Sequence, residues 1–143
     1  MILLRESAIE AIRRHGRESY RDEACGVLYG EIGNGTRRVV RAEPMTNSRE
    51  DERHRRFVVT PDDYRRAEAE ADRSGLALVG FYHSHPDHPA YPSSYDLAHA
   101  LPFFSYVILS VERGEPGALR SFVLSEDRSE FLEELLERKE SQS

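Results

Sequence analysis

The chain has 143 residues, of which 38% are hydrophobic and 32% are charged, and its formal net charge at pH 7 is -6. This length and composition predict one globular domain, residues 1–143, that buries its own core. The negative charge argues against nucleic-acid binding, because a phosphate backbone repels it, and the single cysteine excludes an internal disulfide framework.

The N-terminal residues favour a cytoplasmic location. The apolar start MILL is interrupted by Arg5 and Glu6, which is too short for the apolar segment of a signal peptide. Apolar runs elsewhere fall far below the roughly 18 residues that a membrane-spanning helix needs. We therefore expect no membrane partner.

The first predicted element is a helix. Ala8, Ile9 and Ile12 form an apolar stripe at helical spacing, with Ser7 as the candidate N-cap. The helix is expected to end near Gly16, because glycine is common where helices stop.

A β-hairpin is predicted next. Residues 24–32 (ACGVLYGEI) have the composition of a strand, residues 33–35 (GNG) form a turn, and residues 36–42 supply the partner strand. Glu23 lies where the first of these strands begins.

The middle of the chain combines a charged stretch with a second helix. Residues 48–56 contain no aliphatic side chain and are predicted to form a solvated loop, with contact to a substrate as the alternative. Residues 57–59 (FVV) are predicted as a short strand. Thr60, Pro61 and the two acids after them are typical of a helix start, and this helix is expected to run to about Gly75.

Two histidines follow a predicted buried strand at residues 76–82 (LALVGFY). His83 and His85 are two positions apart, so on a strand they project from one face, roughly 6.5–7 Å apart at the backbone. Two imidazoles can therefore reach one metal ion. Pro86 ends the strand pairing, because proline has no amide hydrogen to donate.

A stiff loop with three prolines leads from these histidines to a short helix. Ser93 is the predicted N-cap, and Asp96 lies three positions later on the same face of the first turn. Asp96 can complete a set of ligands with His83 and His85. Three nitrogen and oxygen ligands leave one position of a tetrahedral zinc open, which is the catalytic arrangement.

The remaining segments complete the predicted fold. Residues 106–112 and 118–124 are expected to pair as a hairpin, and a charged C-terminal helix is expected to dock on the sheet. The class is α+β, with a single mixed sheet flanked by helices. The apolar stripe of the C-terminal helix consists of Phe131, Leu132, Leu135 and Leu136.

The pattern as a whole resembles the JAMM (MPN+) zinc metallopeptidases. Their motif is an upstream Glu, then His-x-His, seven residues, Ser, two residues and Asp. This chain has His83, Ser84, His85, the seven residues 86–92, Ser93, two residues and Asp96. The resemblance implies the JAMM/MPN fold, which is cytidine-deaminase-like, and identifies Glu23 as the companion acid.

The resemblance also implies an activity. Glu23 would take a proton from water and pass it to the leaving amine, and Ser93 would donate a hydrogen bond to the oxyanion, unless it only caps its helix. The chain is similar to the compact prokaryotic members of the family. Those hydrolyse the bond after a C-terminal Gly-Gly of small ubiquitin-like (β-grasp) sulfur-carrier proteins, so such a carrier is the expected partner and Zn²⁺ the expected cofactor.

Other functions agree less well with this sequence. A Cys-His hydrolase would use Cys25 as nucleophile and a histidine as base, but that leaves the spacing of Ser93 and Asp96 unexplained. A non-catalytic MPN-type binding module would not need intact ligands. RadC-like proteins share the spacing but give no reason for the sequence EACG at the first strand. Zinc deaminases are excluded, because the chain has neither His-x-Glu nor Pro-Cys-x-x-Cys.

Overall fold

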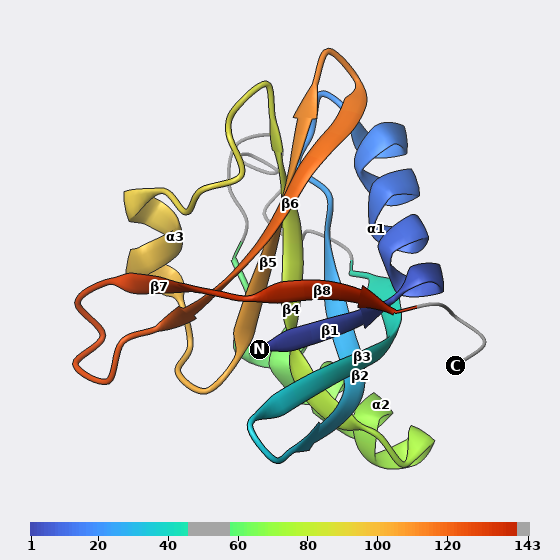
Figure 1. The fold of residues 1–143 in the computed structure, drawn as a ribbon, viewed down its shortest axis with the longest axis vertical. Helices are drawn as coiled ribbons and strands as arrows, with labels where there is room; N and C mark the ends of the chain where they lie inside the picture. Colours follow the sequence, from blue (N-terminus) through green and yellow to red (C-terminus); the bar gives the residue numbers. More distant parts are fainter. Residues whose placement is uncertain (46–57, 140–143) are drawn as a thin grey trace.

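The computed structural model describes residues 1–45 and 58–139. Their strands form one eight-stranded mixed sheet in the order β7-β6-β5-β4-β2-β3-β1-β8 (Figure 1). The predicted α+β class is confirmed. The strands are β1 (Ile2–Arg5), β2 (Cys25–Gly33), β3 (Thr36–Pro44), β4 (Ala77–Pro86), β5 (Ser105–Glu112), β6 (Glu115–Leu124), β7 (Phe131–Glu134) and β8 (Leu136–Lys139), and the helices are α1 (Glu6–Ser19), α2 (Pro61–Ser74) and α3 (Ser94–His99).

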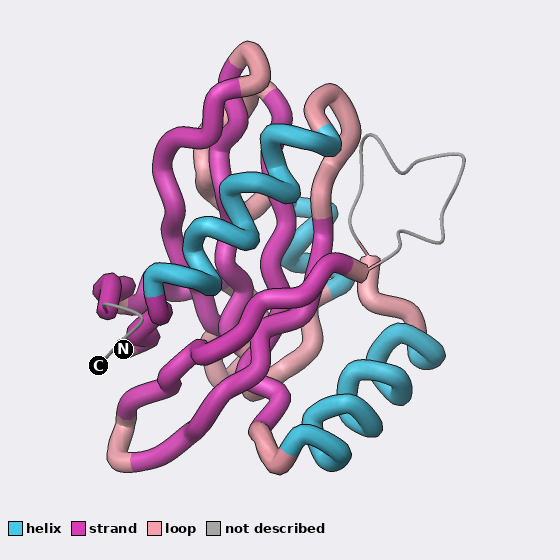
Figure 2. The backbone as a smooth tube through the Cα atoms, turned by 90° about the vertical axis from the view of Figure 1, so that its right-hand side faces the viewer, coloured by secondary structure: helices cyan, strands magenta, loops and turns pink. Residues whose placement is uncertain are grey.

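Helix α1 covers one face of this sheet and helix α2 covers the other (Figure 2). Tyr82 of β4 lies in one apolar cluster with Ile9 and Ile12 of α1. Phe81, its neighbour, lies in a second cluster with Ala67 of α2. Because side chains alternate along a strand, the odd-numbered positions at the end of β4 point to the face opposite α1. The two histidines share that face with Phe81.

Strand β4 is central in the sheet, which buries its C-terminal end. It pairs antiparallel with β2, where Cys25 is opposite His83, and parallel with β5, where Ile108 is opposite His83. His83 is consequently only 1% exposed. The antiparallel register brings the start of β2 beside the end of β4.

The N-terminal prediction was partly wrong. Strand β1 was not predicted, and its last residue, Arg5, is the N-cap of α1 without a side-chain hydrogen bond, so Ser7 is not the cap. The helix also passes through Gly16 and ends at Ser19. A Cβ on Gly16 would lie 2.7 Å from Leu109 Cδ2, so this glycine allows the helix to approach β5 rather than ending it.

Both predicted hairpins are confirmed. β2 pairs antiparallel with β3, and β5 with β6. Their turns contain Asn34 and Gly35, with φ of 51° and 73°, and Arg113 and Gly114, with φ of 53° and 83°. Positive φ at both central residues is typical of the type I′ turn, which matches the twist of the strands that it joins.

The start of α2 is also confirmed. Thr60 accepts a hydrogen bond from the Asp63 amide and Asp63 accepts one from the Thr60 amide, and the helix stops at Gly75 in the left-handed conformation. The predicted strand at residues 57–59 was wrong for Val58 and Val59, which are irregular. Residue 57 and the charged stretch 48–56 lie outside the described residues.

The predicted C-terminal helix was wrong, because the segment forms β7 and β8 instead. A tight turn, in which the Asp127 carboxylate accepts hydrogen bonds from Ser125 and Ser129, reverses the chain after β6. Phe131 then pairs with Leu124 and packs against Tyr106. β7 pairs with β6 and β8 pairs with β1, so the backbone groups along the outer sides of β6 and β1 are hydrogen-bonded. This pairing outweighs the helical spacing of the apolar residues.

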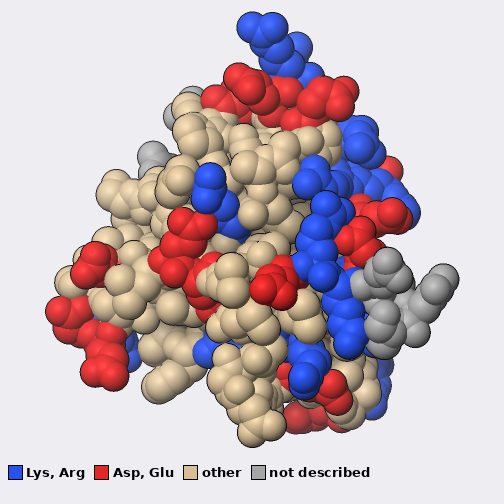
Figure 3. Space-filling model, in the orientation of Figure 1, with Lys and Arg blue, Asp and Glu red and all other residues tan. Residues whose placement is uncertain are grey.

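Charges of both signs are mixed over the face shown in Figure 3, with basic side chains gathered along α1 on the right. The described part of the chain contains no helix with the length and apolar character needed to span a membrane.

Candidate metal centre

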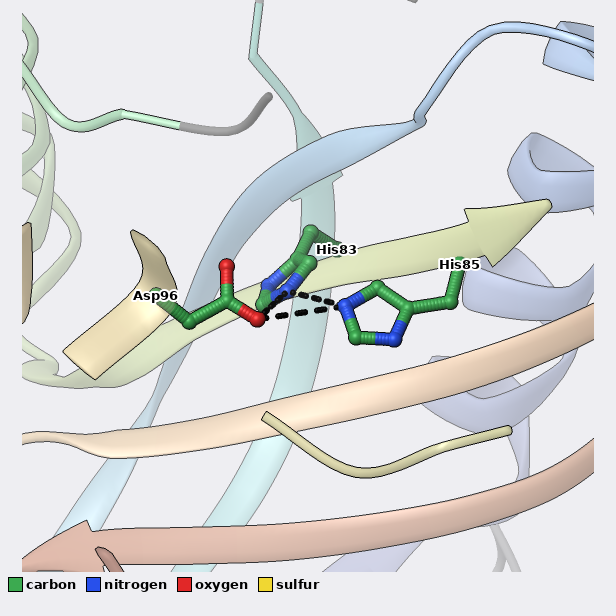
Figure 4. A group of neighbouring side chains, drawn as sticks. All are labelled: His83, His85 and Asp96. Carbon is green, nitrogen blue, oxygen red and sulfur yellow. Dashed lines mark hydrogen bonds and ion pairs between the residues drawn. The ribbon is translucent and has the colours of Figure 1, made fainter. Parts of the chain in front are cut away.

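Three side chains converge at the end of β4 and the start of α3 (Figure 4). His83 Nε2 lies 3.2 Å from His85 Nε2 and 3.3 Å from Asp96 Oδ2. His85 Nε2 lies 3.2 Å from the same carboxylate oxygen. The structure thus brings together the three residues that the sequence predicted as ligands, and they form a group able to hold a metal ion.

The shape of this triangle fits a small cation. Zinc bound tetrahedrally to nitrogen and oxygen at about 2.0–2.1 Å has neighbouring donor atoms about 3.3 Å apart. The three distances of 3.2, 3.2 and 3.3 Å match one face of such a tetrahedron. Three side chains are also the number found in catalytic zinc sites, whereas structural sites use four.

The ring of His85 is oriented by the loop that follows it. Its Nδ1 donates a hydrogen bond to the Pro89 carbonyl oxygen at 2.9 Å. The neutral ring therefore carries a lone pair on Nε2, which faces the Asp96 carboxylate. Two lone pairs facing each other at 3.2 Å repel, so either a proton or a metal ion between the two atoms stabilises the pair. A second-shell hydrogen bond of this kind fixes the tautomer of a metal-binding histidine.

Asp96 has two roles in the structure. Its Oδ2 accepts a hydrogen bond from the Ser93 amide at 2.9 Å, while Ser93 Oγ accepts one from the Asp96 amide at 3.1 Å, which completes a capping box. Burial opposes ionisation of Asp96, but His83, His85 and the Ser93 amide hold the pKa of its carboxyl well below its usual range. Asp96 is therefore an anion whose position is fixed.

The two imidazoles respond differently to their surroundings. Burial lowers the pKa of His83, which favours the neutral form that binds metals. Burial also acts to lower the pKa of His85, but the hydrogen bonds with Asp96 and the Pro89 carbonyl outweigh it, and the pKa is raised. His85 is thus the ring that a metal ion must deprotonate.

Asp87 holds the loop that carries Pro89, a role that the sequence did not reveal. One oxygen of its carboxylate accepts a hydrogen bond from the Tyr20 hydroxyl, and the other accepts one from the Arg113 amide, each at 2.7 Å. Asp87 itself has a positive φ of 59°. Because these contacts are distant in sequence, no local pattern indicates them.

Glu23 lies next to the ligands through the pairing of β2 with β4. The Ala24 amide donates to the buried Ser84 hydroxyl at 2.8 Å, and the Ser84 amide donates to the Ala24 carbonyl at 3.0 Å. Glu23 then lines a cavity of about 710 Å³ together with His85, Ser93 and Asp96. In the sequence, the only sign of these two hydrogen bonds is that the residue between the histidines, Ser84, is polar.

Ser93 borders the same cavity. Its hydroxyl oxygen accepts the Asp96 amide hydrogen, so the hydroxyl hydrogen can be donated to another group. The structure therefore shows the capping role of Ser93 and is compatible with hydrogen-bond donation to a ligand in the cavity.

Cys25 has none of the properties of a nucleophile. It is 2% exposed, and its thiol donates to the Met45 carbonyl at 3.3 Å. Burial raises the pKa of the thiol to about 12, so the thiol stays protonated at neutral pH and is a poor nucleophile.

Replacement of Cys25 by serine is therefore expected to leave turnover of a cleavable substrate within about threefold of the unsubstituted protein, because serine can donate the same hydrogen bond to Met45. Steady-state kinetics on both proteins, with zinc content measured alongside, checks this. A loss of activity beyond about 100-fold at full zinc content would revive the cysteine mechanism.

Comparison with known proteins agrees with this geometry. The family described as prokaryotic homologues of the JAB domain matches residues 5–125. The CysO-cysteine peptidase of Mycobacterium tuberculosis is 34% identical over 127 residues, which cover 85% of this chain and 82% of that protein. The desampylase of Haloferax volcanii is 32% identical over 112 residues, which cover 75% of this chain and 78% of that protein.

Solved structures have the same fold. A protein of Desulfitobacterium hafniense superposes with a TM-score of 0.85 at 33% identity, covering 98% of this chain and 94% of that one. A JAB1/MPN domain protein from Archaeoglobus fulgidus has a TM-score of 0.60 at 18% identity, covering 96% of this chain and 98% of that one. The predicted resemblance is confirmed: the chain belongs to the prokaryotic JAB-domain branch of the JAMM/MPN family, and it is a hydrolase.

Proposed function

We propose that this protein is a zinc-dependent peptidase that cleaves the bond after a C-terminal Gly-Gly of a small ubiquitin-like sulfur-carrier protein. The observation that carries the proposal is the triangle of donor atoms from His83, His85 and Asp96, with sides of 3.2–3.3 Å. The cavity next to it is also lined by Glu23 and Ser93.

Zinc held by His83, His85 and Asp96 would supply Lewis acidity, which would lower the pKa of a bound water to about 7. The chain supplies the proton transfers. Glu23, at the edge of the same cavity, accepts the proton of the attacking water and delivers it to the nitrogen of the leaving amine. One carboxylate can perform both steps because the oxygen of the attacking water and the nitrogen of the leaving amine are bonded to the same carbonyl carbon in the intermediate.

Ser93 stabilises the negative charge that develops on the carbonyl oxygen. Its hydroxyl is held by the capping hydrogen bond at 3.1 Å, so little reorganisation is needed when the charge appears. A preorganised donor of this kind lowers the activation barrier by about 3–4 kcal/mol.

The substrate class is supported by the named relatives and by the cavity walls. Two of the similar proteins are a CysO-cysteine peptidase and a desampylase. Tyr91 lines the cavity and is held in place by the Arg120 guanidinium 4.7 Å from its ring centre and by the Phe122 ring. A Gly-Gly tail has no side chains, so it can lie close against such an aromatic ring.

Replacement of the last tail glycine by valine is expected to lower kcat/KM at least about 100-fold, because a displacement of about 1 Å at the scissile bond costs that much. The experiment uses a small β-grasp carrier with one residue after Gly-Gly, incubated with the zinc-loaded protein and followed by intact mass spectrometry. A carrier with valine four residues before the scissile bond serves as the control. Equal cleavage of both carriers would rule out selection for glycine at this site.

A further inference from the structure

Arg21 lies at the candidate active site without an assigned role. It lines the same cavity as Glu23, His85, Ser93 and Asp96, and its side chain is exposed. It is the only lysine or arginine among the described residues that line this cavity. A cation in the cavity that receives the substrate can bind an anionic part of it.

Two of the acids that line this cavity with Arg21 have other partners. Asp96 contacts both histidines and the Ser93 amide, and Asp87 accepts hydrogen bonds from Tyr20 and from the Arg113 amide. Within residues 1–45 and 58–139, no hydrogen bond or ion pair of the Arg21 guanidinium is found. Its planar group therefore remains available for a carboxylate, which arginine binds through two parallel hydrogen bonds.

The chemistry of the leaving group explains why this cation lies next to Glu23. In the proposed reaction, Glu23 must reach the nitrogen of the leaving amine. When the leaving group is an α-amino acid, its carboxylate carbon lies about 2.5 Å from that nitrogen. A group that binds the carboxylate must then lie beside the group that protonates the amine. Arg21 is two residues from Glu23 and lines the same cavity.

We propose that Arg21 binds the free α-carboxylate of the residue released, and so makes the enzyme select carriers that end in Gly-Gly followed by one α-linked residue. This inference rests on the proposed function. Each further residue would move the carboxylate roughly 3.5 Å away from Arg21, and an isopeptide to a lysine side chain offers no carboxylate near the leaving nitrogen.

Three substrates on one carrier test the assignment. They end in Gly-Gly-Ala with a free carboxylate, in Gly-Gly-Ala with a C-terminal amide, and in Gly-Gly joined to the ε-amine of lysine. The unsubstituted protein is expected to prefer the free acid over the other two by about 10- to 100-fold in kcat/KM, the range for hydrogen bonds to charged groups.

Arg21→Gln is expected to lower cleavage of the free acid by the same factor, mainly by raising KM, and to leave cleavage of the amide unchanged. A contact made equally in the ground state and the transition state changes KM rather than kcat. Arg21→Lys should restore part of the preference, because it keeps the charge but loses the planar geometry. Arg17→Gln, at an exposed position in the last turn of α1, is the matched control and should change nothing.

The outcomes separate two failures. Equal cleavage of acid and amide by the unsubstituted protein, or an equal loss of both in Arg21→Gln, would overturn the role of Arg21 while leaving the peptidase intact. Cleavage of none of the three substrates by the zinc-loaded protein would contradict the proposed function itself, and the Arg21 assignment with it.

Discussion

Replacement of His85 by alanine is expected to lower zinc affinity by at least about 100-fold and to reduce hydrolysis to background. Loss of a hydrogen-bond partner of a metal ligand alone already costs about 10- to 100-fold in affinity, and His85 supplies one of the three donor atoms that the described residues bring together. The side chain lines the cavity and is 10% exposed, so its removal opens toward solvent rather than creating a closed void. Elemental analysis of protein purified without chelator gives the zinc content directly.

His99→Ala is the matched control for this experiment. His99 lies on α3 close to Asp96 in sequence, but it is exposed and its Nδ1 donates to the Tyr95 carbonyl at 3.0 Å. The His99→Ala protein should retain about one zinc per chain and full activity. Thermal unfolding adds an independent measurement, because zinc should raise the melting temperature of His99→Ala but not of His85→Ala. Full zinc content in His85→Ala would contradict the assignment of the ligands.

The part of the site that could be predicted from the sequence depends on local geometry. His83 and His85 share a face because side chains alternate along any strand, whichever sheet the strand joins. The placement of Asp96 follows from the capping box with Ser93, which is a property of the first helical turn. In both cases the contacts that determine the structure lie within a few residues.

The parts that could not be predicted depend on contacts between distant segments. Glu23 reaches the cavity because Ala24 exchanges hydrogen bonds with Ser84, sixty residues later in the chain. The orientation of His85 depends on Pro89, whose loop is held by Asp87 through Tyr20 and Arg113. Such partners leave no periodic signal in one sequence.

The C-terminal segment shows the opposite error, in which a local pattern was followed although a distant contact decides the structure. Phe131 and Leu135 have helical spacing, yet Leu135 is 62% exposed between two short strands. Phe131 packs with Tyr106 and Phe122 on the sheet face that also carries the histidines. The non-local burial of one aromatic ring and the pairing of two edges were stronger than the apolar stripe.

Replacement of Glu23 by glutamine is expected to lower kcat by about 10²- to 10⁴-fold, equivalent to about 3–5 kcal/mol, while zinc content stays the same. Glutamine keeps the size and shape of the side chain but cannot accept the proton of the attacking water at neutral pH. KM should change little, because the lost step belongs to the transition state. Single-turnover cleavage of the carrier tail, with zinc measured on the same samples, separates catalysis from metal binding.

The matched control is Glu31→Gln, which changes the same chemical group on the same strand. Glu31 is exposed near the far end of β2, opposite Arg38 of β3, and it does not line the cavity next to the ligands. Its replacement should leave kcat unchanged. If Glu23→Gln retained near-normal hydrolysis at full zinc content, Glu23 would have no part in the proton transfers. If Glu23→Gln lost its zinc instead, Glu23 would be a metal ligand together with the histidines of β4, and another residue would have to carry out the proton transfers.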